Sequence, residues 1–269
     1  MEASKYEGQG FQPPAEKDAI EFAKKHKDKI AKRGEQFFMD NFGLKVKATN
    51  VVGSGDGVEV FVHCDDHDIV FNASIPFDKS IIDSNSSLRS EDKGDDMSTL
   101  VGTVLSGFEY RTQKEKYDNL YKFFKDNEEK YQYTGFTKEA INKTQNSGYE
   151  NEYFYISTIP YNLTEYRNYF EPLLNKSNSE FSKEMSNVKK QLKDKSKVSV
   201  TTTLFSKNKN YTKKSNSENV IKMAEEIKKE KDLPTDIDFS IQFSDNKINT
   251  IKPNYNGEST SEYGVFDQE

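Results

Sequence analysis

The residues whose types are best suited to chemistry gather in residues 58–77. This segment holds Cys64, the only cysteine of the chain, and two of its three histidines, His63 and His67. Asp65 lies between the histidines, and imidazole and carboxylate groups are common ligands of zinc and other divalent ions. We therefore consider His63, Asp65 and His67 a candidate metal site. The alternative is a polar turn, in which aspartate is frequent and the side chains need not converge.

A thiol nucleophile is the second chemistry that this segment could support, with Cys64 as the nucleophile and a neighbouring histidine as its base. Valines at positions 58, 60 and 62 follow a period of two, which is typical of a strand with one buried face. Adjacent residues of a strand point to opposite faces, so His63 and Cys64 are expected to point apart. Cys64 continues the valine face, and we interpret it as a small buried side chain.

Other motifs of known chemistry are not matched. The glycine-rich stretch 53–57 leads into a strand, whereas a dinucleotide fingerprint must open a helix. Residues 83–94 begin like an EF-hand loop, but Leu88 and Gly94 stand where glycine and glutamate are required. The sequence contains no G-x-S-x-G elbow, H-E-x-x-H pair or Walker loop. We therefore expect no cofactor and find no convincing catalytic constellation.

Composition limits the partners and the compartment. Charged residues make up 31% of the 269 residues and hydrophobic ones only 33%, but 19 Phe and 15 Tyr can still build a core. The net charge of −6 argues against a nucleic-acid partner, because phosphate binding needs concentrated Lys and Arg. A single cysteine permits no internal disulfide. No apolar run approaches the roughly 18 residues that cross a bilayer.

Periodicity predicts the elements that must position these residues. Apolar residues recur at helical spacing over residues 16–42 and predict a helix, which three antiparallel strands follow. These strands are expected at 44–52, 58–64 and 69–77. Further helices are expected at 97–108, 117–131, 164–174, 181–192 and 215–227. Further strands are expected at 152–159, 198–205, 237–243 and 247–251. This order predicts an α+β fold with helices packed on antiparallel sheets, in two α+β units at 1–145 and 146–269.

Three stretches carry a resemblance to a known family: YEGQGFQPPAEKDAIEFAKKHKDKIAKRGEQFF, NVVGSGDGVEVFVHCDDHDIVFNASIPFDKS and LVGTVLSGFEYRTQKEKYDNLY. They resemble the staphylococcal lipoproteins that are grouped as a domain of unknown function. The resemblance covers nearly the whole chain. It implies an exported protein on the extracellular face of the cell membrane, anchored by a lipid on an N-terminal cysteine. The family has no assigned activity or functional residues, so it assigns no site here.

The expected function follows from the resemblance and from the lack of catalytic motifs. We expect a non-catalytic binding or interaction module of the cell envelope, whose partner is a protein or an envelope ligand. Contact with the membrane is expected only through the N-terminal lipid that the resemblance implies. The sequence departs from the family pattern here, because it shows neither a signal segment nor a lipobox cysteine, and the alternative is that this copy is not anchored. The alternative is a metal-assisted hydrolase centred on the hairpin at 58–77.

Overall fold

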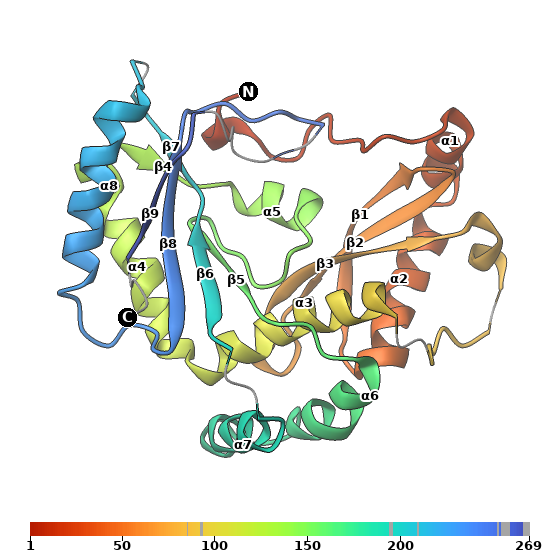
Figure 1. The fold of residues 1–269 in the computed structure, drawn as a ribbon. Coiled ribbons are helices and arrows are strands. Elements are labelled where there is room, and N and C mark those ends of the chain that lie inside the picture. Colours follow the sequence, from red (N-terminus) through yellow and green to blue (C-terminus); the bar gives the residue numbers. More distant parts are fainter. Residues whose placement is uncertain are drawn as a thin grey trace.

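The computed structural model describes residues 1–84, 86–91, 94–193, 196–208, 210–251, 253 and 259–265. Two sheets stand side by side with helices around them (Figure 1). The smaller sheet has the strand order β1-β2-β3, and the larger has the order β4-β7-β8-β6-β5, with β9 also paired to β8. The predicted α+β class is therefore confirmed.

The smaller sheet is the meander that the sequence predicted. Its antiparallel strands are β1 (Val46–Ser54), β2 (Gly57–Cys64) and β3 (Phe71–Phe77), and a 3-10 turn (Asp66–Asp68) joins the last two. Helices α1 (Lys17–Lys25) and α2 (Lys27–Phe42) pack on this sheet. The sequence predicted one helix here, but the backbone leaves the helical region at His26, with φ −112° and ψ 19°, and divides it in two. Short 3-10 turns cover Ala3–Lys5 and Lys79–Asp83.

The larger sheet is mixed. Its strands are β4 (Tyr133–Thr134), β5 (Phe154–Ser157), β6 (Val198–Thr202), β7 (Leu204–Ser206), β8 (Ile237–Ser244) and β9 (Ser261–Gly264). Strands β6 and β7 run parallel to β8 in one continuous register, so the strand predicted at 198–205 is present and is interrupted only at Thr203. Helices α4 (Lys114–Tyr131) and α8 (Lys213–Ile227) cover the face of this sheet that points away from the smaller one (Figure 1).

The remaining helices connect the two sheets. Helix α3 (Asp95–Thr112) packs against β3 of one sheet, β5 of the other, and α7 (Asn178–Gln191). Helix α5 (Lys138–Thr144) lies between the sheets above α3 (Figure 1). The short α6 (Leu163–Glu165) continues into a π turn (Tyr166–Phe170) and a 3-10 turn (Glu171–Leu173). None of the described helices combines the length and apolar composition needed to cross a membrane.

The strand predicted at 247–251 is wrong. Ile248 instead exchanges backbone hydrogen bonds with Met1: the Ile248 N–H donates to the Met1 carbonyl at 2.8 Å, and the Met1 amine donates to the Ile248 carbonyl at 3.0 Å. Asn246 accepts the Ala3 amide through its side chain at 2.7 Å. The antiparallel partner of β8 is β9, which the sequence did not predict.

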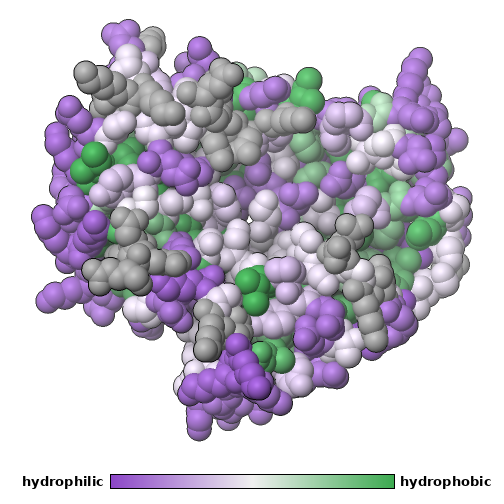
Figure 2. All heavy atoms as spheres, in the orientation of Figure 1, coloured by the Kyte–Doolittle hydropathy of each residue, from purple (hydrophilic) through white to green (hydrophobic). Residues whose placement is uncertain are grey.

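The two main hydrophobic cores draw on both halves of the chain. The core of the smaller sheet includes side chains between Leu163 and Val188, from α6, α7 and the turns between them. The core of the larger sheet includes side chains between Tyr110 and Tyr133, from α3, α4 and β4. The division into units at 1–145 and 146–269 therefore stays a prediction for folding experiments. Figure 2 shows hydrophilic side chains over most of one face, with apolar ones in small separate places.

Candidate functional site

The structure separates the residues of the predicted metal site. His63 lies on β2, where its Nδ1 is 2.6 Å from Oδ1 of Asn72, whereas Asp65 and His67 lie exposed at the turn between β2 and β3. Across the described ranges, no three His, Cys, Asp or Glu side chains gather in a group that could hold a metal ion. The three residues are therefore not brought together, and the metal site stays a prediction.

Cys64 is buried, as the strand pattern predicted. Its thiol points to the Lys45 carbonyl at 3.6 Å, and burial raises the pKa of the thiol to about 12. Since the thiolate is the reactive form, this cysteine stays an inert, protonated side chain at neutral pH. The turn beyond it is more than a solvated tip, because the carboxylate of Asp66 accepts the Lys45 amide at 2.9 Å and ties the turn to the start of β1.

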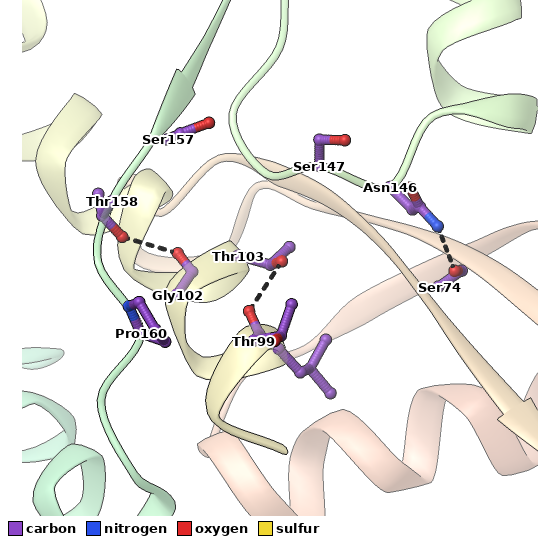
Figure 3. A pocket seen from close by; sticks show the side chains of 10 residues that line it. Ser74, Thr99, Gly102, Thr103, Asn146, Ser147, Ser157, Thr158 and Pro160 are labelled. Atoms are coloured by element: carbon purple, nitrogen blue, oxygen red, sulfur yellow. Dashed lines mark hydrogen bonds between the residues drawn. The ribbon is translucent and has the colours of Figure 1, made fainter. Parts of the chain in front are cut away.

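A cavity of about 440 Å³ opens between the two sheets (Figure 3). Four segments form it: β3, the N-terminal half of α3, the loop after α5, and the chain that leaves β5. Every polar side chain among the described residues that line it ends in a hydroxyl or an amide. These residues are Ser74, Thr99, Thr103, Asn146, Ser147, Ser157 and Thr158, and Leu100, Gly102 and Pro160 complete the lining.

Small residues on α3 bring both sheets to this one helix. A Cβ at Gly107 would lie 2.8 Å from the Val70 carbonyl oxygen, just before β3. A Cβ at Gly102 would lie 3.4 Å from Cα of Pro160, and the Thr158 hydroxyl donates to the Gly102 carbonyl at 2.9 Å. Each glycine costs helix stability of about 0.5–1 kcal/mol relative to alanine. The close approach that they permit sets the width of the cavity.

The segment after α5 joins the two sheets and closes one side of the cavity. Asn72 of β3 and Gly148 exchange backbone hydrogen bonds at 2.8 and 3.0 Å. On the other edge of the same segment, the Ile156 amide donates to the Tyr149 carbonyl at 2.9 Å. Ser106 of α3 holds it from below, because its hydroxyl accepts the Tyr149 amide at 2.6 Å and donates to a carbonyl of its own helix. The wall is therefore fixed by backbone and helix contacts.

Ser74 is the polar centre of the β3 side. Its hydroxyl donates to a carboxylate oxygen of Glu59 at 2.6 Å and accepts from the side-chain amide of Asn146 at 2.7 Å. A serine nucleophile requires a base that takes its proton and is itself held in place. The histidine on this face of the sheet, His63, is bonded to Asn72 instead. This arrangement positions a hydrogen-bonding hydroxyl and does not form a serine–histidine pair.

Glu150 is a titratable group near the cavity wall whose pKa is strongly raised. It is half-buried in the joining segment, opposite Tyr155 of β5, but it does not line the cavity. Burial raises the pKa of its carboxyl to about 8. This side chain is therefore largely neutral at pH 7, and it adds little charge to the surroundings of the cavity.

Sequence reasoning missed this cavity, because its lining comes from four separate segments and contains only common polar residues. One signal was available: Gly102, Ser106 and Gly107 interrupt an otherwise apolar stripe on the predicted helix at 97–108. Small residues at helical spacing indicate that another backbone approaches closely. They could have predicted the place where the sheets meet, although not the hydroxyl lining.

Comparisons with known proteins agree on a family. A family model described as "Protein of unknown function (DUF1672)" matches residues 1–269. The chain is also similar to a crystal structure of a DUF1672 family protein from Staphylococcus aureus, with 68% sequence identity and a TM-score of 0.98. The match covers 100% of this chain and 98% of that one. No match was found among the curated proteins. The chain therefore belongs to the DUF1672 family of proteins of unknown function.

Proposed function

We propose that this protein is a non-catalytic binding module of the cell envelope and that the cavity between the sheets is its binding site. The observation that carries the proposal is the neutral lining of hydroxyl and amide groups. A charged ligand would lose its hydration there without meeting an opposite charge among the lining side chains, since the nearby Glu59 carboxylate already accepts the Ser74 hydroxyl. A neutral polar ligand would exchange hydrogen bonds with water for hydrogen bonds with the lining. The proposed ligand is therefore uncharged and polar.

The size and rigidity of the cavity support this proposal. A volume of about 440 Å³ falls in the range of roughly 300–1,000 Å³ that small-molecule sites occupy. Its walls are held by the Thr158–Gly102 and Asn146–Ser74 hydrogen bonds and by the backbone pairing at Gly148 (Figure 3). A preformed site loses little conformational entropy when a ligand binds.

The envelope location rests on the resemblance to staphylococcal lipoproteins. The hydrophilic side chains on the face in Figure 2 and the lack of an internal disulfide suit a domain that is held at the membrane only by a lipid. In cells that express the full-length gene, replacing the lipid-bearing cysteine should move the protein from the membrane fraction to the medium. Unchanged membrane association after this replacement would contradict the anchored location.

Binding at the cavity is tested with two neutral probes, N,N′-diacetylchitobiose and the blocked tetrapeptide acetyl-Ala-Thr-Ala-Thr-amide. Each is titrated to millimolar concentration while ¹H–¹⁵N spectra of the protein are recorded. At least one probe should shift the amide signals of residues around the cavity. The exposed cavity residue Thr99 is replaced in Thr99→Trp, which should fill the site and remove these shifts.

The matched control is Thr164→Trp, at an exposed helical position outside the cavity. This variant should keep the shifts of the native protein. The proposal fails if neither probe shifts the amides around the cavity, or if Thr99→Trp and Thr164→Trp bind the probes equally well.

A further inference from the structure

We propose that the ligand of this cavity is an extended, uncharged peptide segment that pairs with the backbone of β3 at Ser74. This inference rests on the proposed function, since it names the ligand class of the same site. It follows from the edge position of β3, from the point at which its present pairing ends, and from the chemistry of the opposite wall.

Strand β3 is an edge of the smaller sheet, and its free edge faces the cavity. Its register with β2 is unbroken from Val58↔Phe77 to Cys64↔Phe71. In an antiparallel pair, the backbone N–H and C=O groups of successive residues point to opposite edges of the strand, so those of every second residue point to the same edge. Asn72 directs its N–H and C=O away from β2, because both are bonded to Gly148. Ser74, two residues further along, therefore directs its N–H and C=O to the same outer edge.

Among the described residues, backbone pairing with this edge occurs at Asn72. Opposite Ser74 stands Asn146, which reaches it through a side-chain contact to the serine hydroxyl. Within the part of the chain that the structure describes, no second segment bonds the outward backbone groups of Ser74. An edge with open N–H and C=O groups is a template for another strand. Pro76 lacks an N–H, so pairing along this edge must stop after one more residue.

The opposite side of the cavity suits a peptide backbone. The hydroxyls of Ser147 and Ser157 can donate to the carbonyls or accept from the amides of a strand, and that of Thr103, which donates to the Thr99 carbonyl at 3.2 Å, can accept from an amide. No aromatic side chain occurs among the described lining residues, so a sugar ring has no surface on which to stack. The neutral lining selects against charged side chains in the bound segment.

The test compares acetyl-Ala-Thr-Ala-Thr-amide with the same peptide N-methylated at its two central amides. Methylation keeps the side chains and removes the backbone donors that pairing requires. The methylated peptide should bind about tenfold more weakly, which is the loss expected from one or two net hydrogen bonds. In ¹H–¹⁵N spectra, the Ser74 amide should move downfield with the parent peptide and should not move with its methylated form.

Two variants separate the backbone of Ser74 from its side chain. Ser74→Pro removes the outward N–H and should weaken binding of the parent peptide about tenfold. Ser74→Ala keeps that N–H and removes only the hydroxyl, so it should weaken binding less than Ser74→Pro does. If Ser74→Pro does not fold, the comparison of the two peptides decides the question alone.

The outcomes distinguish the two proposals. Equal binding of the parent and methylated peptides overturns backbone pairing. Binding of N,N′-diacetylchitobiose in the cavity, with no peptide binding, overturns the peptide inference and leaves the proposed function standing. If neither probe binds in the cavity, both proposals are overturned.

Discussion

Replacing Gly148 with alanine should destabilise the wall of the cavity through two separate effects. Gly148 has φ +117°, which lies outside the left-handed region that alanine can adopt. Such backbone strain typically costs about 1–3 kcal/mol. A Cβ there would also lie 2.2 Å from Oγ and 3.0 Å from Cβ of Ser106, and this overpacking typically costs about 1–3 kcal/mol. The free energy of unfolding should therefore fall by about 2–6 kcal/mol.

Gly55 provides a matched control for this substitution. It also has a positive φ, +56°, but no heavy atom lies within 4 Å of the position that a Cβ would take. Gly55→Ala should therefore cost only the left-handed backbone conformation, about 1–2 kcal/mol. In Gly148→Ala/Ser106→Gly, the clashing side chain is absent while the backbone strain remains. The double variant should lose less stability than the two single variants predict, by about 1–2 kcal/mol.

Urea unfolding of the four variants, followed by far-ultraviolet circular dichroism, measures these differences. Gly148→Ala should lower the midpoint well below that of Gly55→Ala and leave the slope of the transition unchanged. If the two variants unfold within about 0.5 kcal/mol of each other, the packing of Gly148 on Ser106 does not hold the wall. If the stability losses of Gly148→Ala and Ser106→Gly add up to the loss of the double variant, the steric part of the reasoning is refuted.

Three further predictions concern the smaller sheet with its turn, the segment that joins the two sheets, and the candidate metal site. Phe71 is fully buried, so Phe71→Ala should cost about 3–5 kcal/mol in urea unfolding, whereas Asp66→Ala should cost about 1 kcal/mol through one lost hydrogen bond; the reverse order would contradict the structure. Because burial raises the pKa of Glu150 from 4.5 to about 8, the folded state holds a proton that the unfolded state has lost between these pH values. Stability should therefore fall as the pH rises through this window, by at most about 1.4 kcal/mol per pH unit, and Glu150→Gln should flatten the slope. Elemental analysis of protein purified without chelator should find no stoichiometric metal, and metal that disappears in His63→Ala/His67→Ala would restore the hydrolase alternative.

The sequence predicted those parts of the fold whose patterns are local. The alternation of residues 58–64 and 69–77 defined β2 and β3, since each strand buries one face on α2 and α3. It did not predict the break at His26, where the apolar stripe continues although the backbone leaves the helix. It misplaced the last strand, because pairing of 247–251 with its neighbour competes with contacts to the distant N-terminus.

The cavity was beyond sequence reasoning for a different reason. Serine, threonine and asparagine are abundant throughout this chain, so their presence at 74, 99 or 146 carries no positional signal. Their convergence depends on how closely α3 approaches both sheets, which is a property of tertiary packing. The histidines and the cysteine attracted attention by their types alone, and the structure places them in a hydrogen bond with Asn72, an exposed turn and a buried strand face.

A crystal structure of the protein soaked with acetyl-Ala-Thr-Ala-Thr-amide tests the central claim most directly. We expect density for an extended peptide between β3 and the chain that leaves β5, with backbone hydrogen bonds to the N–H and C=O of Ser74. The Thr99→Trp protein, soaked in the same way, should show no peptide there. A well-diffracting native crystal whose cavity contains only solvent, or a peptide bound elsewhere on the surface, would contradict the account.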